Sequence, residues 1–242
     1  MARKFRERFK TMGDVFDQFT IRNLFVLSSK DHFVEDTLSP LSIGKEANIF
    51  TAAAKDGDRR VVIKIYRLET CDFNKMSSYL ALDPRYANLK KKKRDVIFAW
   101  CQRECRNLMA CREAGVRAPL PLAFLKNILV MTQVGEEAPA QKIKDDIPKQ
   151  PQKFFAEIIG EIKKLYHYGY THSDLSKFNI LNLDQHPVLI DVSQMLPMNA
   201  PHAYEYLKRD IENVADFFRR LGVKVDNEKV CKEIVAVGTK KV

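Results

Sequence analysis

A short stretch in the second half of the chain combines the side chains that phosphoryl transfer needs. Asp174 follows His172 in the pattern H-x-D-x-x-x-x-N, which Asn179 completes. Asp191 stands twelve residues further on, at the end of an apolar strand pattern. Phosphoryl transfer requires a carboxylate beside the nucleophile and oxygen ligands for a divalent metal ion. Asp174 suits the first role, Asn179 and Asp191 suit the second, and their spacing is that of a kinase catalytic loop with its metal-binding aspartate.

The same residues also have structural explanations. Asp174 and Asn179 can cap turns, and Asp191 can simply end a strand. All three would then match the kinase spacing by chance, so we favour the catalytic interpretation. Asp210 leaves two interpretations open, because it can brace the catalytic loop from behind or pair with an exposed lysine one helical turn away.

A lysine and a glutamate occupy positions where apolar residues are expected. Lys64 lies within the apolar strand pattern 61–65, on the same face as Val62 because side chains alternate along a strand. Glu104 falls on the apolar stripe of a long helix. A buried charge is costly without a partner, so we predict a Lys64–Glu104 ion pair of the kind with which kinases hold the α- and β-phosphates. The alternative is that Glu104 lies at the edge of its stripe and reaches solvent.

The segment 42–49 has the frame of a glycine-rich phosphate loop, but it keeps only the central glycine, Gly44. Alone this match is weak, and a plain turn before a strand is the default interpretation. Its position just before the predicted lysine strand favours phosphate binding. Backbone amides near Gly44 and the hydroxyl of Ser42 would then contact the phosphates.

Periodicity and turn residues predict the elements that position these groups. A leading helix is expected over 15–29, and an Asp56-Gly57 turn predicts a hairpin between strands at 48–54 and 59–66. Further along, we predict a mobile loop at 83–94, a helix over 95–114 closed by Gly115, a strand at 127–134, an irregular linker at 136–151, a helix over 153–168, strands at 179–183 and 188–191, and a last helix over 203–221.

This order of elements is typical of an α+β chain with two lobes. We divide it into an N-terminal helical extension (1–37), an N-lobe of β-sheet plus one long helix (38–134) and a mainly helical C-lobe (135–242). With 45% apolar and 30% charged residues the composition is that of a globular protein. No apolar run is long enough for a membrane span or a signal peptide, and the odd number of scattered cysteines favours reduced thiols. We therefore expect a cytoplasmic protein without a membrane partner.

The net charge of +10 favours an anionic partner. Much of it is concentrated in residues 90–94 and in the first ten residues. A solvated loop is the alternative explanation for such a run. Aromatic residues are not interleaved with it, so the sequence supports attraction to a phosphate backbone and not a stacking surface for bases.

Several motifs together resemble the RIO family of atypical serine/threonine kinases, and its subfamily one in particular. They are Ser42-Ile43-Gly44-Lys45-Glu46-Ala47-Asn48, Val62-Ile63-Lys64-Ile65-Tyr66-Arg67, Arg103-Glu104-Cys105-Arg106-Asn107-Leu108, His172-Ser173-Asp174-Leu175-Ser176 and Ile190-Asp191-Val192-Ser193-Gln194. The resemblance covers about residues 15–225. It implies a trimmed two-lobed kinase fold that binds ATP with Mg²⁺ or Mn²⁺, with Asp174 and Asp191 catalytic and with Asn179 and Asp191 on the metal. The implied cofactor-binding residues are Ser42, Gly44, Lys45, Ile49, Val62, Lys64, Glu104, Met131, Thr132 and Val134.

The chain also departs from ordinary kinases. Asp191-Val192-Ser193 replaces Asp-Phe-Gly, and residues 192–202 leave no room for an activation loop before the next helix. The sequence therefore does not establish a protein substrate. In the RIO family the metal-binding aspartate is thought to accept the phosphoryl group, which implies an aspartyl-phosphate on Asp191 and an ATPase switch. The family acts in maturation of the small ribosomal subunit, so the resemblance implies a pre-ribosomal particle or rRNA as partner.

Two other functions fit parts of the pattern. Aminoglycoside-type phosphotransferases share the catalytic motif, but they have a larger acidic substrate region than the roughly 50 residues that follow Asp191. A basic protein also attracts cationic substrates poorly. The other alternative is a non-catalytic, RNA-binding pseudokinase scaffold, against which the filled catalytic positions argue.

Overall fold

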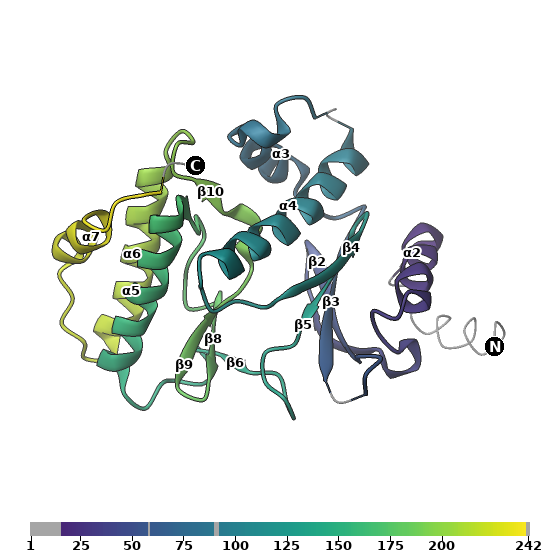
Figure 1. The fold of residues 1–242 in the computed structure, drawn as a ribbon, viewed down its shortest axis with the longest axis horizontal. Coiled ribbons are helices and arrows are strands. Elements are labelled where there is room, and N and C mark those ends of the chain that lie inside the picture. Colours follow the sequence, from purple (N-terminus) through teal and green to yellow (C-terminus); the bar gives the residue numbers. More distant parts are fainter. Residues whose placement is uncertain (1–15, 58, 90–91, 241–242) are drawn as a thin grey trace.

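The structure is a computed structural model in which two lobes lie side by side (Figure 1). It describes residues 16–57, 59–89 and 92–240, so the first basic cluster of the chain, Lys90 and Lys91 lie outside the description. Among the described helices, none is long and apolar enough to cross a bilayer. The helices are α2 (Gln18–Ser29), α3 (Phe73–Ala81), α4 (Lys93–Glu113), α5 (Pro151–Tyr168), α6 (Ala203–Arg220) and α7 (Asn227–Val235), with short 3₁₀ helices η1 (Glu35–Thr37), η2 (Pro84–Tyr86) and η3 (Val192–Gln194).

A five-stranded antiparallel sheet, in the order β1-β2-β3-β5-β4, forms the N-lobe. The predicted hairpin is its centre. The register sets Ile49 opposite Lys64 and Val62 opposite Met131, so these four side chains share one face of the sheet. The strands are β1 (Ser39–Ile43), β2 (Ala47–Ala53), β3 (Arg60–Tyr66), β4 (Pro121–Leu125) and β5 (Ile128–Thr132).

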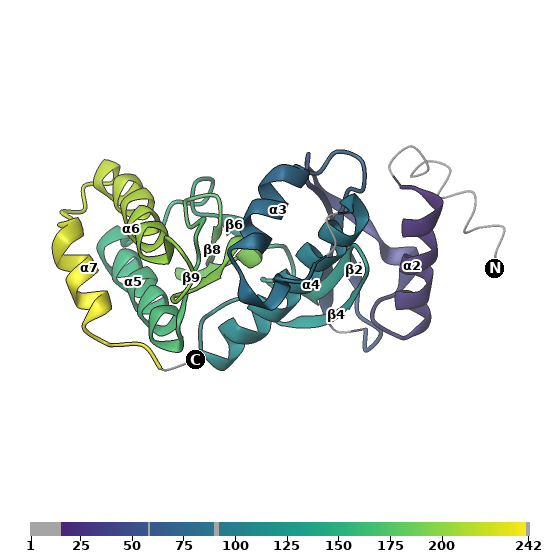
Figure 2. The ribbon, with the colours of Figure 1, turned by 90° about the horizontal axis from the view of Figure 1, so that it is seen from above.

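Two hydrophobic cores lie on the two faces of this sheet. On the outer face, Phe50 and Ile63 belong to one core with Leu24 of α2. On the inner face, Leu129 and Met131 join the core that contains α4 and the C-lobe helices. Figures 1 and 2 accordingly show α2 and α4 on opposite sides of the sheet. Because side chains alternate along each strand, the face that carries Lys64 and Val62 is the one that packs against α4.

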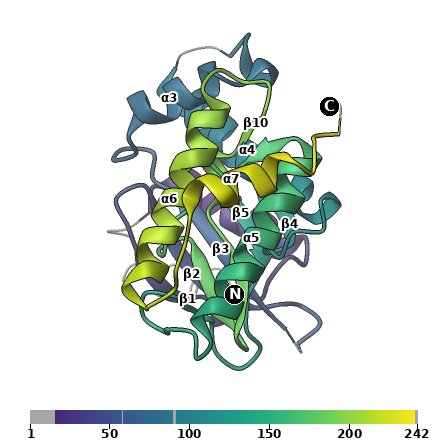
Figure 3. The same ribbon diagram turned by 90° about the vertical axis from the view of Figure 1, so that its left-hand side faces the viewer.

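The C-lobe is built on α5 and α6, with α7 packed across them (Figure 3). Phe154 and Phe155 of α5 meet Phe218 of α6, with ring centroids 6.2 and 5.4 Å apart. Two small sheets carry the loops that face the N-lobe. They contain β6 (Gln141–Lys142), β8 (Ile180–Leu183) and β9 (His186–Leu189) in one sheet, and β7 (Tyr170–Thr171) and β10 (Leu196–Pro197) in the other.

Most predicted elements are present, with ends shifted by a few residues. The helices α3 and α7 and the strands β1 and β4 were not predicted, so the helix over 203–221 is not the last one. The two-residue strands β6, β7 and β10 were not predicted either, and β6 lies within the segment 136–151 that we expected to be irregular. The helices α3 and α7 have only nine residues each, which is too short for a clear apolar period. β4 begins at Pro121 at the edge of the sheet, where proline argues against a strand in sequence analysis.

The segment between β3 and α4 is better anchored than the mobile loop that we predicted at 83–94. Asp83 is fully buried and accepts hydrogen bonds from the Arg85 side chain, at 2.9 Å from Nε to Oδ1 and 2.7 Å from Nη2 to Oδ2. The fully buried Arg103 of α4 has its Nε 3.5 Å from Asp83 Oδ2. Because a buried charge needs a partner, this contact ties the described part of the segment to α4.

Hydrogen bonds and one glycine fix the conformation of the connection between the lobes. The Gln133 side chain accepts a bond from the Thr51 hydroxyl (2.7 Å) and donates one to Gly135 O (3.1 Å). Gly135 has a φ of +93°, and a Cβ added there would lie 2.2 Å from Ala138 O. Only glycine fits this position without moving the backbone. The division into 1–37, 38–134 and 135–242 remains our prediction.

Gly135→Ala should destabilise the protein by about 2 kcal/mol or more, because it combines a left-handed backbone with a backbone clash. Gly160→Ala is the matched control, since Gly160 lies within α5 and no atom lies within 4 Å of its added Cβ. We expect this control to raise stability by about 0.5–1 kcal/mol. Urea-induced unfolding followed by circular dichroism measures both changes, and equal midpoints for the two variants would contradict the prediction.

Candidate active site

Lys64 on β3 binds two carboxylates that come from different parts of the chain. Its Nζ lies 2.6 Å from Glu104 Oε1 on α4 and 2.9 Å from Asp191 Oδ1, just after β9. The predicted Lys64–Glu104 pair is confirmed. Glu104 is 2% exposed, so its placement at a solvent-facing edge is wrong. The Tyr66 hydroxyl, which sequence analysis missed, donates to Glu104 Oε2 and satisfies its second oxygen.

Opposing effects set the pKa values of this cluster. Burial favours a neutral lysine, but the charges of Asp191 and Glu104 raise the pKa of Lys64 above its ordinary value. Asp191 keeps 44% of its side-chain surface exposed. Its partial burial favours the neutral acid, yet the charge of Lys64 and hydrogen bonds from Lys64 and Ser193 lower the pKa of Asp191 to about 2. Lys64 is therefore a cation and Asp191 an anion across the neutral range.

Helix α4 also holds the turn that follows Asp191. Asp191 adopts a left-handed backbone with φ of +57°. The Asn107 side chain donates to Val192 O (2.8 Å), and Arg103 Nη2 donates to Met195 O (2.9 Å). Sequence analysis assigned no role to Arg103 or Asn107, although they lie four residues apart and therefore on the same side of the helix. α4 thus positions both carboxylates that bind Lys64. It carries Glu104, and its Arg103 and Asn107 side chains hold the backbone that follows Asp191.

Asp174 is oriented by two amide side chains. Asn179 Nδ2 donates to the backbone oxygen of Asp174 (2.8 Å), and Gln194 Nε2 donates to Asp174 Oδ2 (2.8 Å). Burial raises the pKa of Asp174, and the negative charge of Asp191 raises it further. A carboxylate with a raised pKa is a better proton acceptor. Gln194 is a further residue that sequence analysis left without a role.

Asp210 of α6 braces the catalytic loop from behind. Its Oδ2 accepts from Ser173 N (2.7 Å), and its Oδ1 accepts from Leu175 N (2.8 Å). Arg209 holds the same loop through Ser173 O (2.6 Å). Asp210 is 1% exposed, which confirms the brace and excludes the exposed pair. Burial raises the pKa of Asp210 to about 7, even though these donors oppose the shift.

Comparison with known proteins agrees with this geometry. Residues 48–230 match the RIO domain family. The chain is 40% identical over 234 residues to the RIO-type serine/threonine-protein kinase Rio1 of Methanocaldococcus jannaschii, with 96% of this chain and 79% of the relative covered. It is 37% identical over 231 residues to the Rio1 of Haloferax volcanii, with 95% and 79% covered. The chain belongs to the RIO family. It is a kinase-type phosphotransferase, as predicted.

Solved structures with a similar fold are available for comparison with this RIO-family chain. The Rio2 kinase from Chaetomium thermophilum, solved as an ADP/Mg²⁺-phosphoaspartate complex, has a TM-score of 0.67 at 22% identity over 88% of this chain and 65% of that chain. A second structure of this Rio2 kinase has a TM-score of 0.68 at 23% identity over 91% and 68%. This likeness, taken as evidence of fold alone, confirms the trimmed two-lobed kinase fold. α2 is the predicted extra N-terminal helix.

The nucleotide-binding residues that we predicted fall into two groups in this RIO fold. Ser42 pairs with Ile49 and therefore shares the sheet face of Lys64, together with Val62 and Met131. Two further members, Thr132 and Val134, are placed differently in the sheet and the connection that follows it. Thr132 pairs with Val61 on the outer face, and its hydroxyl accepts from Leu120 N (2.9 Å). Val134 O accepts from Ala140 N (2.8 Å). These assignments remain predictions.

The turn at Gly44 is held by the chain itself. Gly44 N donates to Ala47 O (3.1 Å), so this amide is not directed at a phosphate in the way that we expected. A Cβ at Gly44 would lie 2.8 Å from Ala47 O, which explains the glycine by the tightness of the turn. Lys45 is exposed, and its backbone oxygen accepts from the Thr70 hydroxyl (2.7 Å).

The predicted metal ligands have the right donor chemistry for Mg²⁺. Asn179 uses its Nδ2 on Asp174, which leaves Oδ1 as an oxygen ligand. Asp191 uses Oδ1 on Lys64 and on the Ser193 hydroxyl (3.1 Å), which leaves Oδ2. Carboxylate and carbonyl oxygens are the ligands that Mg²⁺ prefers, so these residues would suit a Mg²⁺ ion like the one in the Rio2 kinase complex.

Asp210→Ala should destabilise the protein by about 2–4 kcal/mol, because two buried N–H groups of the catalytic loop lose their acceptor. Asp216→Ala on the same helix is the matched control. The Asp216 side chain is 56% exposed and pairs only with Arg219 among the described ion pairs, so a change below about 0.5 kcal/mol is expected. Urea unfolding measures both values. A small effect of Asp210→Ala would show that the catalytic loop does not depend on this carboxylate.

Asp191→Asn should lower stability in a way that depends on pH. The pKa of Asp191 is about 2 in the folded chain, below its ordinary value of 3.8. The charged form therefore stabilises the fold above about pH 4, and this contribution is lost as the pH falls toward 2. We expect a lower unfolding midpoint than wild type at pH 7 and a smaller difference near pH 3. Thermal unfolding across this range is the measurement, and a difference that stays constant would contradict the assignment.

Proposed function

We propose that this RIO-family chain is an ATP- and Mg²⁺-dependent kinase or ATPase that forms an aspartyl-phosphate on Asp191 and acts in maturation of the small ribosomal subunit. The observation that carries the proposal is the shared Lys64, whose Nζ lies 2.6 Å from Glu104 Oε1 and 2.9 Å from Asp191 Oδ1. A phosphate-binding cation and the candidate phosphoryl acceptor thus lie in contact. A Rio2 kinase solved as a phosphoaspartate complex lends support from a related fold.

Each side chain has a defined role in the proposed reaction. Lys64, fixed by Glu104, binds phosphate oxygens of ATP. Asn179 and Asp191 hold Mg²⁺, which neutralises charge on the phosphates. Ile49, Val62 and Met131 offer an apolar surface on the same sheet face, against which the adenine packs.

The covalent step is a transfer to Asp191 Oδ2, the oxygen that Lys64 and Ser193 do not contact, and Asn179 Oδ1 would remain for Mg²⁺ during this step. Oδ2 forms a bond to the γ-phosphorus while the bond from that phosphorus to the β–γ bridging oxygen breaks, and ADP leaves. Water then attacks the phosphorus, and Asp174 accepts its proton. The acyl-phosphate bond breaks, which releases inorganic phosphate and restores Asp191. Asp174 suits this task because its pKa is raised by burial and by Asp191.

The proposed partner is ribosomal RNA in a pre-ribosomal small subunit, within the cytoplasm. The net charge of +10 supports an anionic partner. The segment 192–202 contains only η3 and β10 before α6 begins, so an activation loop for peptide substrates is absent from this described part of the chain. This favours a switch that cycles on itself over a kinase that modifies many peptides.

Incubation with γ-labelled ATP and Mg²⁺ tests the proposal. We expect label on the protein that hydroxylamine removes and that Asp191→Asn abolishes, because acyl phosphates react with hydroxylamine. Asp174→Asn should retain nucleotide binding but lose release of inorganic phosphate by at least about a hundredfold. Asp216→Asn, an exposed carboxylate on α6, is the control that should behave as wild type.

The other outcomes identify the other functions. A hydroxylamine-stable phosphoserine would indicate a conventional protein kinase and would contradict the aspartyl-phosphate. Label transferred only to an added aminoglycoside would indicate a small-molecule phosphotransferase. Absence of both labelling and ATP hydrolysis would indicate a non-catalytic scaffold.

A further inference from the structure

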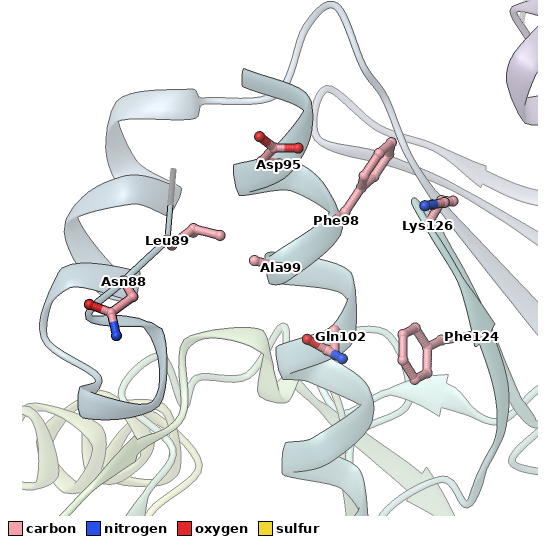
Figure 4. A pocket seen from close by; sticks show the side chains of 8 residues that line it. All are labelled: Asn88, Leu89, Asp95, Phe98, Ala99, Gln102, Phe124 and Lys126. Atoms are coloured by element: carbon pink, nitrogen blue, oxygen red, sulfur yellow. The ribbon is translucent and has the colours of Figure 1, made fainter. Parts of the chain in front are cut away.

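The fold gathers aromatic and basic side chains that are far apart in the sequence. A cavity of about 570 Å³ lies against α4, between the segment that precedes this helix and strand β4 (Figure 4). Gln102, which lines it, and Glu104 are two residues apart on α4, so their side chains point to opposite sides of the helix. The cavity is therefore separate from the Lys64 cluster. It is lined by Asn88, Leu89, Asp95, Phe98, Ala99, Gln102, Phe124 and Lys126.

Two phenylalanine rings form one wall of this cavity. Figure 4 shows Phe98 of α4 and Phe124 of β4 on the same side, with the carboxamide of Gln102 next to Phe124. Phe124 is 41% exposed although it is a large apolar residue. Phe19 of α2 stacks on Phe98, with ring centroids 5.6 Å apart and planes 17° apart. An exposed ring beside stacked rings offers a flat aromatic surface on which another ring can stack.

Cations surround the same rings. Lys126 Nζ lies 5.5 Å from the centroid of Phe98, and the Arg94 guanidinium lies 5.3 Å from that of Phe19. Lys92 and Arg94, which flank the start of α4, are exposed. Alternating aromatic and cationic groups are the arrangement with which proteins bind single-stranded nucleic acid. Arg94, at the end of the basic run, thus has an aromatic neighbour in space that the run lacks in the sequence.

The polar groups of the cavity suit the edge of a nucleobase. Asn88 and Gln102 each present a carboxamide, which both donates and accepts hydrogen bonds. Asp95 adds an acceptor for an exocyclic amine. A volume of about 570 Å³ lies within the range of small-ligand sites. A purely apolar peptide side chain would leave these polar groups without partners, whereas a base would satisfy them.

We propose that this cavity is a second nucleotide site, which binds one base of single-stranded RNA with its phosphate on Lys126 and Arg94. The base stacks on Phe124 and is bonded by Asn88 and Gln102. The proposal rests on the proposed function only for the expectation of an RNA partner. It adds a site that is distinct from that of ATP and that lies on the other side of α4.

Fluorescence anisotropy with a labelled single-stranded RNA of about ten nucleotides tests this site. Phe124→Ala should weaken binding by about tenfold, because it removes one stacked base. Lys126→Gln should reduce the slope of log affinity against log salt by about 0.7, because one phosphate contact is lost. Saturating ATP should not displace the RNA, and both variants should keep wild-type labelling by γ-labelled ATP.

Matched controls and contrary outcomes are available. Phe25→Ala removes a 55% exposed ring on α2, and Lys224→Gln removes an exposed charge in the C-lobe, and neither should change RNA binding. RNA affinity that is equal in wild type and Phe124→Ala would overturn the proposal and would favour a protein segment as occupant. No RNA binding by the wild type at low salt would also overturn it, while a hydroxylamine-labile label would still support the proposed function.

Discussion

One buried cation determines how the two lobes fit together. Lys64 is only 8% exposed, yet it is charged, and its two partners come from α4 and from the loop after β9. Breaking a buried pair of this kind costs about 3–5 kcal/mol, because it leaves a charge without a partner. This ammonium group therefore contacts all three parts of the candidate site: the sheet, the long helix and the loop after β9. Phosphate oxygens would compete with Asp191 for this ammonium, which in the proposed reaction frees the carboxylate when ATP is present.

Helix α4 connects this ion pair to other parts of the molecule. One side carries Glu104, and the same turns carry Arg103 and Asn107, which hold the backbone after Asp191. Arg103 also approaches Asp83, so the segment before the helix is tied to the same network. A shift of α4 would disturb all of these contacts together, because packed interiors rearrange between discrete states and do not deform smoothly. The same helix therefore contributes Gln102 to the cavity on one side and Glu104 to the Lys64 cluster on the other.

Sequence analysis identified residues of the candidate site that interrupt an apolar pattern or match a known spacing. Lys64 and Glu104 were predictable because a charge inside an apolar strand or stripe needs an explanation, and Asp174, Asn179 and Asp191 were predictable from their spacing. Arg103, Asn107 and Gln194 were not, because a polar residue on a helix or turn is ordinary until its distant backbone or side-chain partner is known. The sequence also did not reveal that Thr132 lies on the outer face of the sheet, for a related reason. The register of β5 depends on β3 and β4, which no single strand reveals.

The left-handed backbone of Asp191 restricts which residues evolution can place there. With a φ of +57°, the position suits glycine, asparagine and aspartate far better than glutamate or a branched residue. Of these three, only aspartate carries a negative charge for Lys64 and an oxygen nucleophile. Almost no substitution at position 191 would therefore keep both the backbone conformation and the charge of this aspartate. Under the proposed reaction, a descendant of this chain that loses catalysis but keeps its fold should carry asparagine or glycine at position 191.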